Sequence, residues 1–167
     1  MDILAHALWT NLAYYKKYKN ELRDRLWAVF FGIAPDLVSF TPATIFALLF
    51  RPKFDLQSLL SSQNWVYVWA RESYNYTHSL VSFVIVMVIV MLVRKGKPYW
   101  PLLGWALHIF IDIFTHHNFY ETPFLFPLSH FKNSFSVSWA EPWFMAINYG
   151  SILILYILIF AVWKKKT

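Results

Sequence analysis

The sequence predicts an all-α integral membrane protein, a bundle of four to five transmembrane helices with a long interfacial connection. Of its 167 residues, 58% are hydrophobic and only 14% are charged, whereas soluble domains hold about 25% charged residues. Several long apolar segments carry no charge, and basic clusters follow them. Tryptophan, which prefers the membrane interface, flanks the most apolar segment. We therefore expect one membrane-embedded domain over residues 1–167.

The first two expected helices are short and flank a basic turn. Residues 1–15 and 22–35 are apolar, and the turn is "KKYKNELRDR" at 16–25. Each helix covers roughly 22 Å, so it needs tilt or a thin bilayer, and the first could instead lie in the interface. The start has no basic region, so we expect no cleaved signal peptide. Pro35 predicts the end of the second helix.

A fresh helix is expected to start at Thr41 and Pro42, inside a long connection over 37–77. This connection is rich in aromatic residues but interrupted by charges and Pro52, which favours an interfacial cap.

The next two helices are expected to form a hairpin. Residues 78–93 and 99–115 are apolar, and only a short basic turn separates them. The connection over 116–142 holds three prolines and is expected to be irregular. The last helix, 143–163, has no charge over 21 residues and is long enough to span a membrane.

The basic residues predict the orientation of the bundle. Eleven of the fifteen Lys and Arg residues fall at 16–25, 94–97 and 164–166. The positive-inside rule places all three clusters on the cytoplasmic side, so both long connections lie on the non-cytoplasmic face. Clusters beside apolar segments are topology signals, so we expect no nucleic-acid partner.

Six His and Asp side chains interrupt the apolar helices, where their insertion into a bilayer costs free energy. Each lies roughly 15 Å or more from the expected cytoplasmic edge. An Asp at the centre of a membrane helix costs about 2.5 to 3.5 kcal/mol, so such residues normally face a partner inside the bundle. In "GWALHIFIDIFTHHNFY" the spacing puts three of them on one helix face. Imidazole and carboxylate together suit zinc first, with manganese or iron also open. The predicted ligands of one or two ions are His6, Asp36, His78, His108, Asp112 and His116.

Structural explanations remain open for several of these residues. His6 fits an interfacial histidine near the end of a helix. Asp36 fits a helix cap or turn, and His78 with Thr77 and Ser79 fits an N-terminal cap of the helix over 78–93. His117 points about 100° away from His116 and is excluded from the set.

Five segments carry a family resemblance, "MDILAHAL", "GIAPDLVSF", "THSLVSF", "GWALHIFIDIFTH" and "FPLSH". In this order they resemble the motifs of the YdjM-like family of membrane-bound, predicted metal-dependent hydrolases. The resemblance implies that His6, Asp36, His78, His108 and Asp112 are the polar positions that matter, with Ser79 and Thr115 beside them. The family often has a His-Arg pair where this chain has Ser73 and Tyr74, and its Gly-containing loop is replaced by "HHNFYETPFLF". Any substrate contact of that Arg is therefore in doubt.

The leading functional hypothesis is a hydrolase that uses a metal-activated water on a phosphoester, or another ester, of a lipid or similar amphiphile. Asp112 or Asp36 would bridge two ions, and Glu121 or Glu72 would take the proton. The expected location is a prokaryotic cytoplasmic membrane, with the site towards the non-cytoplasmic face. The alternatives are a small metal-ion or proton transporter that uses the same residues, and a scaffold whose His-Asp pairs only set helix register.

Overall fold

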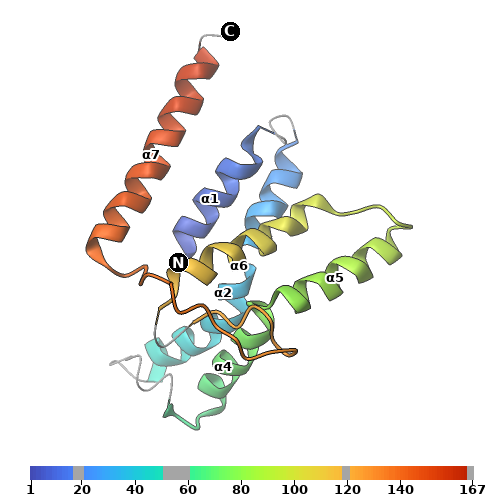
Figure 1. The fold of residues 1–167 in the computed structure, drawn as a ribbon, viewed down its shortest axis with the longest axis vertical. Coiled ribbons are helices and arrows are strands. Elements are labelled where there is room, and N and C mark those ends of the chain that lie inside the picture. The colour runs from blue at the N-terminus through green and yellow to red at the C-terminus, as the bar shows by residue number, and fades with distance from the viewer. Residues whose placement is uncertain (17–20, 51–60, 118–120, 165–167) are drawn as a thin grey trace.

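A computed structural model describes residues 1–16, 21–50, 61–117 and 121–164 of this chain. Within these ranges every regular element is a helix, so the prediction of an all-α fold is confirmed for the described residues. The elements in chain order are α1 (Ile3–Tyr15), α2 (Leu22–Phe50), α4 (Trp65–Thr77), α5 (Leu80–Val93), the 3-10 helix η1 (Trp100–Leu102), α6 (Leu103–Thr115) and α7 (Pro142–Lys164) (Figure 1).

Two of the described helices are long and apolar enough to cross a membrane. These are α2 and the Pro142–Ala161 part of α7. The pair α4 and α5 passes the same test only when the two are taken together, and it is bent by 67° at the break between them. The apolar segment Trp100–Thr115 is shorter. The expectation of four to five spans thus stays a prediction.

Helix α2 does not end at Pro35, which corrects the sequence-based expectation. It runs without a break through Pro35 and Pro42, so no new helix starts at Thr41. Proline is tolerated inside membrane helices because neighbouring helices and hydroxyl side chains satisfy the freed backbone groups. Pro35 is buried in this packing. As a result, residues 37–50 belong to α2 rather than to a connection, and Asp36 lies midway along the helix.

The expected connection also holds α4, which packs against α2. The side chain of Asn64 caps the start of α4 by accepting from the backbone nitrogen of Val66 at 3.1 Å. Helix α4 ends at Thr77 with His78 as its C-cap, and Ser79 caps α5 by accepting from the backbone nitrogen of Ser82 at 3.1 Å. His78 thus sits at a helix break, and Ser79 takes the capping role.

Two glycines let the inner helices approach closely. A Cβ on Gly104 of α6 would lie 2.2 Å from the carbonyl oxygen of Ala28 in α2. A Cβ on Gly32 of α2 would lie 2.4 Å from Oγ1 of Thr10 in α1. The backbones of α2 and α6 therefore meet directly, the Thr10 side chain packs against the backbone of α2, and α2 is the centre of the packing.

The outer elements surround this centre. Helices α5 and α6 form the expected hairpin, and α7 stands apart at the side of α1 (Figure 1). Trp9 of α1 donates to Asn148 of α7 at 2.8 Å. The described parts of 116–142 are irregular and lie near α4 (Figure 1). Residues 17–20, 51–60, 118–120 and 165–167, which include parts of the predicted basic clusters and of both connections, lie outside the described residues.

Candidate metal centre

Four of the six predicted ligands meet in one buried group. Asp36 comes from the middle of α2, His78 from the break between α4 and α5, and His108 and Asp112 from successive turns of α6. One ligand atom from each residue lies within 4.8 Å of the others. Both histidines and Asp112 are fully buried, and Asp36 is 4% exposed. Donors from three parts of the chain therefore converge at a point that is buried from the surface.

The ring of His108 is oriented by the backbone of α2. Its Nδ1 lies 2.8 Å from the carbonyl oxygen of Gly32, which can only accept a hydrogen bond. We therefore assign the ring proton to Nδ1, which leaves a lone pair on Nε2. That Nε2 points into the cluster, 3.0 Å from Oδ2 of Asp112. A second partner that fixes the tautomer in this way is usual for histidines that bind metals.

His78 has an equivalent arrangement with Thr77. The Thr77 hydroxyl donates to the carbonyl oxygen of Ser73 at 2.9 Å, so its oxygen is free to accept from Nδ1 of His78, also at 2.9 Å. Ser39 of α2 lies 2.9 Å from the same hydroxyl. This assignment leaves the lone pair of His78 on Nε2, which lies 3.4 Å from Oδ1 of Asp36 and 3.5 Å from Oδ2 of Asp112.

These two tautomers bring the lone pairs of both imidazoles close to two carboxylates inside the protein. The Nε2 atoms of His78 and His108 are 3.0 Å apart, and both carboxylates lie beside them. Oδ2 of Asp112 is buried and forms no hydrogen bond with any described residue. Lone pairs and carboxylates at such distances repel one another in a low-dielectric interior unless a cation lies among them. The donor set therefore fits a divalent metal ion, and the cluster can hold one.

The other two predicted ligands flank Asp112. His6 of α1 has Nε2 3.0 Å from Oδ1 of Asp112, and its ring stacks on His108 with the centroids 3.8 Å apart. Nδ1 of His6 is buried without a hydrogen-bond partner among the described residues. His116 follows α6 with Nδ1 3.5 Å from Oδ2 of Asp112. The nitrogen of Met1 contacts Oδ1 of Asp112 and lies 3.1 Å from Nε2 of His116.

The two predicted proton acceptors are not brought to the cluster. Glu72 is exposed on α4, and Glu121 is half-buried in the irregular segment. Neither forms an ion pair or hydrogen bond with the cluster within the described parts of the chain. Glu72 lies two residues before Tyr74, which places it about 200° around the helix, away from the side that faces the cluster.

Several supporting residues escaped the sequence analysis. Tyr74 is buried, stacks on His78 with the centroids 3.8 Å apart, and its hydroxyl lies 3.1 Å from Nδ1 of His116. The roles of Thr77 and of the Gly32 carbonyl also depend on contacts between elements. A local indication in the sequence exists only for Thr77, which stands next to His78 in the Thr-His-Ser motif.

The interpretation of Asp36 as a cap is wrong, because Asp36 lies inside a continuous helix. The predicted cap over residues 77–79 is confirmed through Ser79, whose side chain caps α5, while His78 is the C-cap of α4. The side chains of Asp36 and His78 both face the cluster.

Together, the fold and site define an all-helical chain with helices of membrane-spanning length and apolarity, and with a buried His/Asp centre that can hold a metal ion. Comparisons with protein-family models, curated proteins and solved structures found no match to this chain.

Proposed function

We propose that the protein is a membrane-embedded metal-dependent hydrolase that cleaves a phosphoester, or another ester, of a lipid or similar amphiphile. The observation that carries the proposal is the four-residue centre, in which two histidine lone pairs and two carboxylates face one another inside the bundle. Two buried aspartates in an apolar helical protein are expensive, and such residues normally serve a function. The order of the motifs that resemble the YdjM-like family supports the same proposal.

Asp36, His78, His108 and Asp112 would hold the ion, with zinc as the preferred metal because imidazole and carboxylate are its common ligands. A bound divalent ion supplies Lewis acidity, which lowers the pKa of a water molecule to about 7 and polarises a phosphoryl or carbonyl oxygen. The carbonyl of Gly32 and the hydroxyl of Thr77 hold the two imidazoles in the orientation that such a centre needs.

His6 is placed to handle the proton. Its Nε2 contacts Asp112, and its Nδ1 has no partner among the described residues. His6 would therefore take the role in proton transfer that the sequence analysis gave to Glu72 or Glu121. The proposal keeps the orientation in which the centre opens towards the non-cytoplasmic face of a cytoplasmic membrane.

The test is elemental analysis of the purified full chain, together with phosphoesterase and liposome-flux assays. We expect about one or two zinc ions per chain in the wild type, and loss of both metal and hydrolysis in Asp112→Ala. The matched control is Asp24→Ala, which removes a carboxylate of α2 that has no contact with the described cluster residues. Wild-type protein without a bound transition metal would refute the proposal. Bound metal with ion flux and no hydrolysis would favour the transporter.

A further inference from the structure

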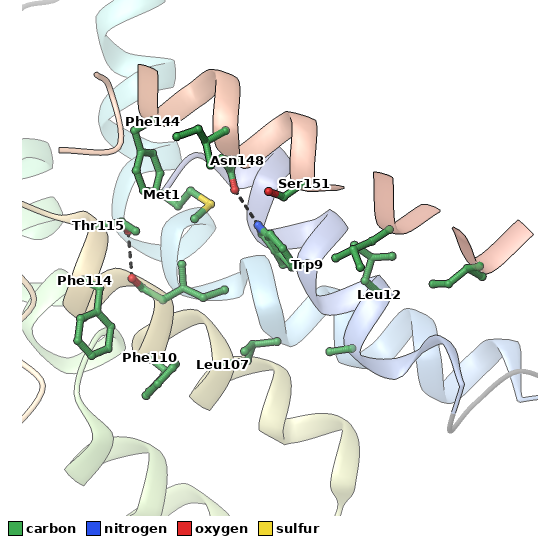
Figure 2. A pocket seen from close by; sticks show the side chains of 15 residues that line it. Met1, Trp9, Leu12, Leu107, Phe110, Phe114, Thr115, Phe144, Asn148 and Ser151 are labelled. Carbon is green, nitrogen blue, oxygen red and sulfur yellow. Dashed lines mark hydrogen bonds between the residues drawn. The ribbon is translucent and has the colours of Figure 1, made fainter. Parts of the chain in front are cut away.

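A second feature of the chain is an apolar pocket of about 670 Å³ beside the metal centre. It lies between α1, α6 and α7 (Figure 2). Its lining residues recur every three or four positions on α6 and α7, so each helix contributes one face. On α7 this face extends from Phe144 to Ile159, a length of roughly 22 Å.

The pocket borders the metal centre through two of its lining residues. Thr115 lines it and is 5% exposed, and its hydroxyl lies 3.4 Å from Oδ1 of Asp112. Met1 also lines it, and its nitrogen contacts the same oxygen. Thr115 and Met1 therefore both line the pocket and contact Asp112, so a molecule in the pocket would lie next to the centre. The four candidate ligands themselves are buried and do not line the pocket.

One polar group on the pocket wall has unused hydrogen-bonding capacity. Asn148 is 5% exposed and points across the pocket to Trp9, which donates to its side-chain oxygen (Figure 2). Its Nδ2 has no hydrogen-bond partner among the described residues. A buried amide donor without a partner is costly, and an acceptor from a ligand would satisfy it. The carbonyl oxygen of an acyl ester is such an acceptor.

The size of the pocket suits a small molecule or a single acyl chain. Its volume falls within the usual range for small-molecule sites. Its lining is almost wholly apolar, with Asn148, Ser151 and Thr115 as the polar exceptions.

We propose that this pocket binds the acyl chain of the substrate, so that the substrate is an acyl lipid with its headgroup at the metal centre and its chain along α7. This inference rests on the proposed function for the identity of the molecule as substrate. Binding of the chain itself depends only on the pocket.

The test uses the full chain in detergent micelles and a lysophosphatidylcholine probe with a photoactivatable diazirine near the end of its acyl chain. We expect the label to concentrate at Leu155 and Ile159, the far end of the pocket. Ser151→Trp fills the pocket and should lower this labelling about tenfold, a loss that matches an ordinary overpacking cost. Leu153→Trp is the matched control, because Leu153 is 61% exposed and does not line the pocket.

Two additions keep the result decisive. Leu12→Trp narrows the pocket from α1 and should act like Ser151→Trp if that variant fails to fold. Labelling is repeated after metal removal and in Asp112→Asn, where it should persist. Wild-type protein that is labelled in the pocket but hydrolyses no ester would contradict the proposed function and leave the binding of the acyl chain standing. In active protein, Ser151→Trp should lower kcat/KM for a long-chain phosphoester relative to a short-chain one.

Two outcomes would overturn the inference. One is label spread evenly over the exposed faces of α5 and α7, with no effect of the Trp variants. The other is a cross-link at Leu155 or Ile159 to a second copy of the chain, which would make the pocket a dimer contact.

Discussion

Gly104 offers the sharpest perturbation of the metal centre, because it lies one helical turn before His108 and touches no ligand itself. A Cβ at position 104 would lie 2.2 Å from the carbonyl oxygen of Ala28 and 3.1 Å from the nitrogen of Gly32. Both are backbone atoms, which no rotamer change can move. Ordinary contact begins at 3.4 Å, so Gly104→Ala forces α6 and α2 apart by about 1 Å.

This displacement acts directly on the histidine that α6 carries. The hydrogen bond from His108 to the Gly32 carbonyl spans the same helix interface at 2.8 Å, and a further 1 Å breaks it. Loss of a partner that orients a metal-binding histidine costs about 10- to 100-fold in affinity. We also expect a loss of about 1 to 3 kcal/mol in the free energy of unfolding, the usual cost of overpacking.

The assay is competition for zinc between the purified protein and a chromophoric chelator, with thermal unfolding measured in parallel. Gly150→Ala is the matched control, because a Cβ there would meet nothing within 4 Å. It should leave zinc affinity unchanged and can add up to about 1 kcal/mol of helix stability. Wild-type zinc affinity in Gly104→Ala would refute the reasoning, as would an equal loss in the control.

Two further predictions concern residues beside the ligands. Thr77→Val removes the acceptor for Nδ1 of His78 and should weaken zinc binding about 10- to 100-fold in the same competition assay. Thr44→Val, at an exposed position on α2, should not weaken it, and equal effects would show that Thr77 has no orienting role. His6→Gln should retain the zinc content measured by elemental analysis while hydrolysis falls by roughly 10²- to 10⁴-fold. Loss of zinc from His6→Gln would instead make His6 a ligand.

Much of the site was readable from local sequence. His108 and Asp112 lie four residues apart, and in any helix that spacing places both side chains on one face. Because such side chains cost free energy in an apolar segment, the sequence predicted that they face a partner inside the protein and serve a function. The all-helical class followed from composition and apolar length in the same way.

The path of α2 could not be read from local rules. Pro35 and Pro42 predict helix ends when only the backbone of one segment is considered. Trp69 of α4 donates at 3.1 Å to the carbonyl oxygen of Val38, which Pro42 leaves without its helical donor, and this contact depends on how α4 packs on α2. The same continuity changed Asp36 from a residue at a helix end to one at the middle of the longest described helix.

The sequence by itself predicted an all-helical chain with helices apolar enough to cross a membrane and with His108 and Asp112 on one helix face, because composition and the 3.6-residue period act within a single segment. Only the tertiary structure decided which four of the six predicted ligands meet in one group, that Glu72 faces away from it, and that an apolar pocket borders Thr115 next to Asp112. These features depend on distances between segments, and the close approach of α1, α2 and α6 sets those distances.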